Sequence, residues 1–114
     1  MITLYGIPNC DTVKKARSWL DQNNISFQFH NFKKDGLSED LLDVWLKDIG
    51  WETLLNKRGT TWRKLDDDTK NNIDESSARR IMLENPSIIK RPVLDTGSSK
   101  YVGFKDAEYT TIFS

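Results

Sequence analysis

One residue of this 114-residue chain, Cys10, is well suited to covalent chemistry, and it is the only cysteine. It follows a short apolar segment and precedes a segment with helical periodicity, so it falls where a helix is expected to begin. Unpaired backbone N–H groups at a helix N-terminus favour negative charge and can lower the pKa of a thiol. The polar neighbours Asn9, Asp11 and Thr12 favour a reactive thiol over the alternative, a small buried hydrophobic residue.

The rest of the composition narrows the chemistry that Cys10 could perform. Position 13 is Val13, so there is no Cys-x-x-Cys motif, and a disulfide formed at Cys10 must be resolved by glutathione or another external thiol. The only histidine, His30, is expected at the far end of a strand, where a solvated role is favoured over a cysteine–histidine dyad. One cysteine and one histidine cannot complete a tetrahedral zinc site, and we expect no metal.

Two arginines could supply positive charge beside a thiolate or a bound anion. Arg91 directly precedes Pro92 in strand-like sequence, which predicts a cis peptide bond or a strand that begins there. Arg58 lies beside Gly59 in an expected turn. A guanidinium group binds oxyanions and carboxylates in fork geometry and lowers the pKa of an adjacent thiol. Surface charge is the alternative role for these arginines.

The composition also limits the classes of partner and the location. Lysine plus arginine and aspartate plus glutamate each count 17, and zero net charge removes the electrostatic case for binding nucleic acid or acidic membranes. No apolar run approaches the length of a membrane span, and the first residues lack the pattern of a signal peptide. We therefore expect one domain, residues 1–114, in the reducing cytoplasm, without nucleic-acid or membrane partners.

The hydrophobic pattern of the first third predicts a strand–helix–strand unit. Ile2–Tyr5 is expected to form a buried strand, Asp11–Asn23 a helix, and Ser26–Phe32 a second strand parallel to the first. Phe27 and Phe29 are expected on one face of this second strand.

A helical block and a β-hairpin are expected to follow. Ser38 is predicted to cap a helix that Gly50 ends, and Asp74 to cap a helix that continues to Glu84, with short helices between them. The last elements are expected to be a strand, a turn, a returning strand and a helix, over Ile88–Leu94, Asp95–Ser99, Lys100–Val102 and Lys105–Phe113. The strands at both ends must meet in one mixed sheet, so the helical block is an insertion in an α/β fold.

Three segments together resemble the family of glutaredoxin-coupled arsenate reductases. They are GIPNC at 6–10, LLNKRGTTWRKL at 54–65 and NPSIIKRPV at 85–93, in the order and spacing of that family. The resemblance covers nearly the whole chain and is closest to the Spx/YffB-like branch. It implies a thioredoxin-like mixed sheet with a helical insertion at about residues 37–85. It also implies that Cys10 is the nucleophile, that Arg91 binds an anion before a cis Pro92, and that Arg58, with a small shift, is a second active-site arginine.

The chain also departs at three places from the families that it resembles. Arsenate reductases of this kind carry a histidine where this chain has Gly6, and their third active-site arginine has no match near residues 103–105. Spx regulators usually carry Cys-x-x-Cys, which Val13 interrupts.

The residues and the resemblance together favour a glutathione-dependent thiol reductase that acts on a mixed disulfide or an oxyanion. Cys10 would attack, glutathione would be the cosubstrate, and glutaredoxin is a further expected partner. Asn9, Thr12 and Pro92 are expected to contact the substrate. The alternative is an Spx-like regulatory protein that binds RNA polymerase.

Overall fold

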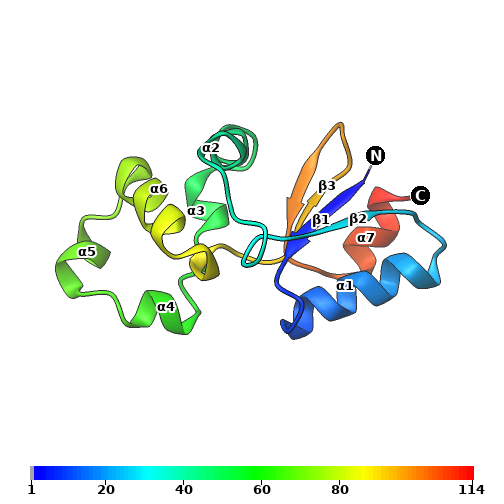
Figure 1. Cartoon of the computed structure of the whole chain (residues 1–114), viewed down its shortest axis with the longest axis horizontal. Coiled ribbons are helices and arrows are strands. Elements are labelled where there is room, and N and C mark those ends of the chain that lie inside the picture. Colours follow the sequence, from blue (N-terminus) through cyan, green and yellow to red (C-terminus); the bar gives the residue numbers. More distant parts are fainter. Residues whose placement is uncertain (1) are drawn as a thin grey trace. The chain divides into compact units, whose positions relative to one another are not determined.

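The computed structural model describes residues 2–114 (Figure 1), which divide into two compact units. The first comprises the chain up to Asp35 together with Arg91–Ser114, and the second is Gly36–Lys90. The predicted helical insertion, about residues 37–85, lies inside the second unit. A single domain over residues 1–114 stays a prediction, and its first residue, Met1, lies outside the described residues.

The first unit contains a four-stranded mixed sheet in the order β2-β1-β3-β4, which confirms the predicted α/β class. β1 pairs in parallel with β2 and antiparallel with β3, and β3 pairs antiparallel with β4. The parallel pairing of β1 and β2 follows from the helical crossover between them, as predicted. The strands are β1 Thr3–Gly6, β2 Gln28–Asn31, β3 Val93–Asp95 and β4 Lys100–Val102.

Two helices, α1 (Asp11–Gln22) and α7 (Asp106–Ile112), pack on one face of this sheet. Their apolar residues recur at helical spacing and join inward-facing strand residues in one core. The fully buried members of this core are Leu4, Ala16, Leu20, Leu94 and Tyr109. The core therefore holds α1, whose first turn follows Cys10, firmly against the sheet.

The second unit is helical, and apolar side chains of its helices, such as Leu42, Trp45 and Met82, are buried. Ser38 caps the first helix as predicted, because its Oγ accepts the N–H of Leu41 at 3.1 Å. Asp74 and Ser77 form a reciprocal capping box at the start of α6 (Glu75–Glu84), which confirms the predicted start of this helix. The helices are α2 Glu39–Asp48, α3 Trp51–Leu54, α4 Thr60–Arg63, α5 Asp67–Asn71, α6 Glu75–Glu84 and the 3₁₀ helix η1 Pro86–Ile88.

The strand predicted at Ile88–Leu94 is wrong at its first five residues, because β3 covers only Val93–Asp95. Ile88 ends η1, and Ile89 makes only an isolated bridge with Leu55 inside the second unit. β3 begins at Val93, directly after a proline that has no N–H to donate to a ladder. The apolar run therefore extends over both units, and only its end joins the sheet.

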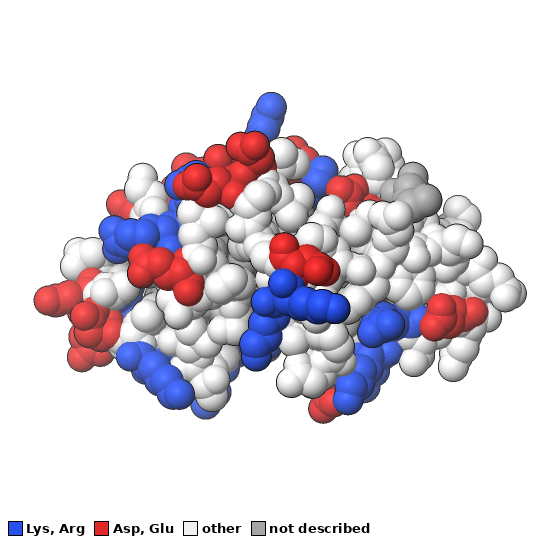
Figure 2. Space-filling view, in the orientation of Figure 1, with Lys and Arg blue, Asp and Glu red and all other residues white. Residues whose placement is uncertain are grey.

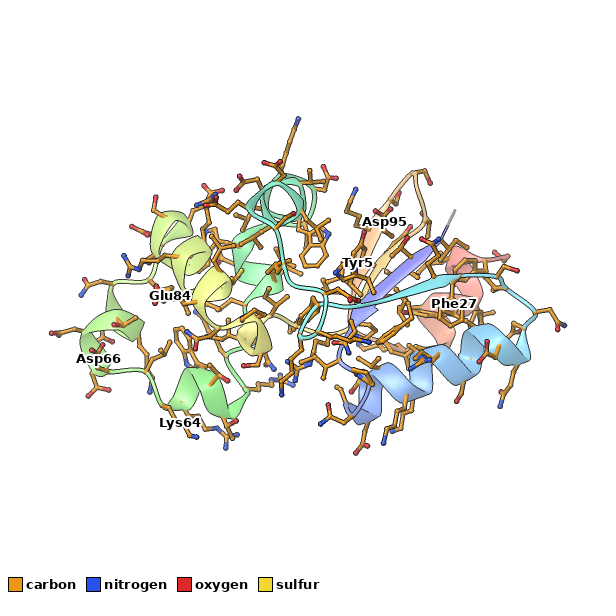
Figure 3. All side chains as sticks on the ribbon, in the orientation of Figure 1. Tyr5, Phe27, Lys64, Asp66, Glu84 and Asp95 are labelled. Carbon is orange, nitrogen blue, oxygen red and sulfur yellow. The ribbon has the colours of Figure 1, made fainter. Side chains whose placement is uncertain are left out.

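The surface carries charges of both signs over both units (Figure 2). Figure 3 shows Tyr5 and Asp95 on the sheet of the first unit, and Lys64, Asp66 and Glu84 on the helical second unit. Across the part of the chain that the structure describes, none of the helices is both long enough and apolar enough to span a bilayer.

Candidate active site

The backbone places Cys10 at the start of α1, immediately before its first residue. The Cys10 N–H donates to the carbonyl of Ile7 at 3.2 Å, which closes the turn after β1. Cys10 itself is the N-cap residue, with extended dihedral angles of φ −88° and ψ 127°, and its carbonyl accepts the N–H of Lys14 at 2.9 Å. The half-buried free thiol therefore lies among the unpaired N–H groups of the first turn, as predicted.

The surroundings of the thiol lower the pKa of Cys10 below its ordinary value. Partial burial raises this pKa, but the groups that stabilise the thiolate outweigh it. In order of size, these are the backbone N–H of Val13, the hydrogen bond and the charge of the Arg91 guanidinium, and the backbone N–H of Thr12. The backbone N–H groups at the start of α1 and the Arg91 guanidinium thus both stabilise the thiolate form of Cys10.

Arg91 reaches the thiol through the antiparallel pairing of β3 with β1. Tyr5 of β1 lies opposite Val93 of β3, so the residues before Val93 run beside the loop after β1. The Arg91–Pro92 peptide bond is cis and the strand begins at the next residue, so both features predicted from Pro92 are present. The buried Pro92 accepts the N–H of Gly103 at 2.8 Å through its carbonyl, which fixes this corner to the end of β4.

The other predicted site residues have different surroundings. Asn9 is exposed in the loop before Cys10, and Thr12 acts on the sulfur through its backbone. Arg58 is exposed in the second unit; its N–H donates to Asn56 Oδ1 at 3.1 Å, and its carbonyl accepts from Arg63 at 3.0 Å. Roles for Asn9, Thr12, Pro92 and Arg58 in substrate binding stay predictions.

Gly6 is a site residue whose role the sequence did not indicate. Its φ is not in the left-handed region, and the residue is the buried end of β1. A Cβ atom at this position would lie 2.8 Å from Cγ2 and 3.1 Å from Cγ1 of Val13. Gly6 is therefore required by the close approach of β1 to the first turn of α1, which the residue pattern alone does not reveal.

The fold and this site define the class: a thioredoxin-like α/β protein with a cysteine at the N-terminus of its first helix and an arginine–cis-proline pair beside it. A family model described as the ArsC family matches residues 5–112. The chain therefore belongs to the ArsC family.

Individual relatives agree with this membership. The chain is similar to the solved YFFB protein, with 46% identity and a TM-score of 0.94 over 100% of both chains. It is also similar to an arsenate reductase (ArsC) related protein from Brucella melitensis, with 51% identity and a TM-score of 0.83 over 99% of this chain and 94% of that one. The global transcriptional regulator Spx of Streptococcus mutans is 32% identical over 95% of this chain and 80% of its own length.

Proposed function

We propose that this protein is a glutathione-dependent thiol reductase in which Cys10 is the nucleophile. The observation that supports this proposal is the pair of thiolate-stabilising contacts, from the Val13 N–H and the Arg91 guanidinium, around the only cysteine. The thiolate, rather than the thiol, attacks disulfides, so a lowered pKa increases the reactive fraction at neutral pH.

The substrate that fits a single cysteine is a mixed disulfide between glutathione and another thiol. The Cys10 thiolate attacks the glutathione sulfur, which forms a Cys10–glutathione disulfide and releases the substrate thiolate to take a proton from water. A second glutathione, as its thiolate, attacks the glutathione sulfur of this adduct and releases the Cys10 thiolate. The net reaction converts the mixed disulfide and one reduced glutathione into the substrate thiol and oxidised glutathione. A glutaredoxin thiol can replace the second glutathione.

The two arginines have separate roles in this proposal. Arg91 stabilises the attacking thiolate of Cys10 and, as that thiolate is consumed, offers its guanidinium to a carboxylate of the bound glutathione. Arg58 is proposed to hold a second anionic group of the substrate. Asn9, Thr12 and Pro92 are proposed as the polar and apolar contacts around the disulfide.

Intact-mass analysis after incubation with oxidised glutathione tests the proposal. We expect one glutathione adduct on the wild-type chain, no adduct on Cys10→Ser, and loss of the adduct when reduced glutathione is added. Arg91→Ala and Arg58→Ala should slow adduct formation, whereas Arg80→Ala, which removes an exposed arginine from its pair with Glu84, should not. Adduct formation no faster than with a free cysteine at the same pH would contradict the proposal.

A second candidate function is regulation through RNA polymerase, and the observation that favours it is the similarity to the Spx regulator of Streptococcus mutans. The test is capture of purified RNA polymerase by the wild-type chain and by Cys10→Ala. Saturable binding that is unchanged by Cys10→Ala, together with a thiol of ordinary reactivity, would favour the regulator. No binding, together with a glutathione adduct, would favour the reductase.

A further inference from the structure

β2 is an edge strand with unused backbone groups. β1 lies on one side of it, and among the described residues no strand lies on the other. The N–H groups of Gln28 and Phe32 donate toward β1, at 2.8 and 3.2 Å. Because backbone groups alternate in direction along an extended chain, the N–H and C=O groups of Phe27 and Phe29 point outward, away from the sheet.

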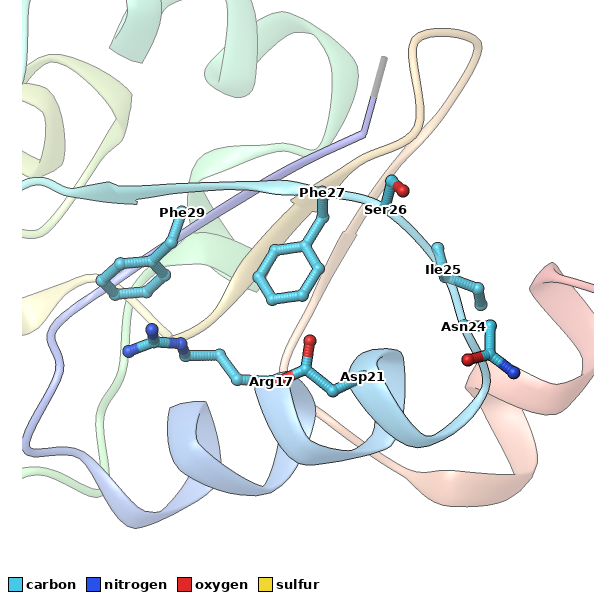
Figure 4. A pocket seen from close by; sticks show the side chains of 7 residues that line it. All are labelled: Arg17, Asp21, Asn24, Ile25, Ser26, Phe27 and Phe29. Carbon is cyan, nitrogen blue, oxygen red and sulfur yellow. The ribbon is translucent and has the colours of Figure 1, made fainter.

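The side chains of the same two phenylalanines line a groove between β2 and α1 (Figure 4). The groove has a volume of about 570 Å³, and Arg17 and Asp21 of α1 form its other wall. The Arg17 guanidinium lies 4.3 Å from the centre of the Phe29 ring. Asp21, one helical turn further along, lies at the level of Phe27. Within residues 2–114 the structure records no ion pair between Arg17 and Asp21.

We propose that this edge binds a second copy of the same chain, by antiparallel pairing of the two β2 strands. With the two-fold axis at Gln28, Phe27 of each copy faces Phe29 of the other. The outward N–H and C=O groups of both residues are then used in two hydrogen-bonded pairs. The phenylalanine rings of the two copies lie opposite each other on one face of a continuous sheet.

The charges on α1 match this symmetry. A crossover helix runs antiparallel to its strands, so Arg17 lies at the level of Phe29 and Asp21 at the level of Phe27. The two-fold axis reverses this order in the second copy. Each Arg17 therefore faces Asp21 of the second copy, and the interface contains two equivalent Arg17–Asp21 ion pairs. This complementarity of the chain with itself favours a second copy over an unrelated strand as the occupant.

The sequence of the edge agrees with pairing. Proteins keep exposed edge strands apart with lysine, proline or bulges. The strand Gln28–Asn31 contains no lysine, proline or glycine, and its side chains are amide, aromatic and imidazole groups. The edge thus lacks the usual protection against a second strand.

A cysteine cross-link tests the register. In a Cys10→Ser background, Gln28→Cys places the two new thiols at the axis, in a non-hydrogen-bonded pair about 4.5 Å apart at Cα, within the range of a disulfide. Ser26→Cys is the matched control on the same face of the strand. In the proposed register, two copies of residue 26 are separated by four residues of strand, roughly 13 Å. We expect a covalent dimer from Gln28→Cys and none from Ser26→Cys.

Charge exchange tests the ion pairs. Sedimentation of the uncross-linked chain should show a concentration-dependent dimer. Arg17→Asp and Asp21→Arg should each weaken dimerisation at least about tenfold, because each creates two like-charge contacts. The double variant restores both pairs and should recover the wild-type association, while circular dichroism verifies that all variants fold.

Two results would overturn the proposal. One is a wild-type chain that stays monomeric and a Gln28→Cys variant that gives no cross-link. This result would mean that a second copy does not bind the β2 edge and that another protein's strand is the remaining candidate. The other is a dimer that the single charge variants do not weaken, which would place the interface elsewhere. Neither result bears on the proposed thiol chemistry, because no residue of this interface contacts the sulfur of Cys10.

Discussion

Replacing Gly6 by alanine tests whether close packing of β1 on α1 sets the geometry of the site. The new Cβ atom would lie 2.8 Å from Cγ2 of Val13, well inside the contact distance of two carbon atoms. Val13 is fully buried, and a β-branched side chain in a helix has one strongly preferred rotamer, so it cannot rotate away. The strand and the helix must therefore move apart.

The expected cost can be worked from these contacts. Overpacking in a core costs about 1–3 kcal/mol, and the lower backbone entropy of alanine in the unfolded chain returns about 0.4–1 kcal/mol. We expect Gly6→Ala to lower the free energy of unfolding by about 1.5 kcal/mol. With an unfolding entropy of about 2.1 cal/mol/K per residue over 114 residues, this corresponds to a fall of about 6 °C in Tm.

A double-mutant cycle distinguishes this contact from a general effect of alanine. Val13→Ala alone should cost about 2 kcal/mol, because it deletes two buried methyl groups. In Gly6→Ala/Val13→Ala the new methyl group occupies the space that Val13 vacates, so the double variant should be more stable than the sum of the single changes by about 1 kcal/mol or more. Urea unfolding measures all four proteins. If the two effects add to within about 0.5 kcal/mol, the proposed contact is not the reason for glycine at position 6.

Three further predictions concern the thiol and a helix cap. Arg91→Ala should raise the pKa of Cys10, measured from the alkylation rate as a function of pH. Arg91→Lys should lower the pKa only part of the way back, since lysine keeps the charge but loses the fork geometry. An unchanged pH profile in Arg91→Ala would show that Arg91 does not act on the thiol. Because the folded-state pKa of Cys10 is lowered, its ionisation stabilises the fold fully above the ordinary value of 9.0, and this gain is lost as pH falls through the folded-state pKa. The stability of wild type relative to Cys10→Ser should therefore rise with pH between these two values, and a constant difference would contradict the lowered pKa. Ser38→Ala should lower the free energy of unfolding by about 1 kcal/mol in urea, with Ser76→Ala, inside α6, as an exposed serine without a capping role; equal effects would show that the bond to Leu41 is not the cause.

The sequence was most informative where a local rule decides the structure. The apolar periodicity after Asp11 placed the start of α1, and this start placed Cys10 at the N-cap. Capping side chains at Ser38 and Asp74 located two further helices for the same reason. In each case, the residues that determine the element lie within one or two turns of it.

Features that depend on distant partners could not be predicted in this way. Ile88 and Ile89 have the same local character as a strand, but the Ile88 carbonyl accepts the N–H of Asn56 and Ile89 bridges Leu55, both inside the second unit. The need for glycine at position 6 depends on Val13, which becomes its neighbour only after the chain turns back as a helix. The sequence indicated Arg91 only as a source of positive charge beside the thiolate; its hydrogen bond to Cys10 depends on the strand order β2-β1-β3-β4, which the residue pattern did not give.

The two segments of the first unit are separated in the sequence by the whole second unit, so they are synthesised at different times. Cys10 leaves the ribosome before the whole of Gly36–Lys90, whereas Arg91 leaves after it. Until β3 pairs with β1, the thiol therefore lacks the hydrogen bond and the charge of its arginine and stays more fully protonated. In the proposed reaction, a nascent chain would therefore form mixed disulfides at Cys10 more slowly than the folded protein.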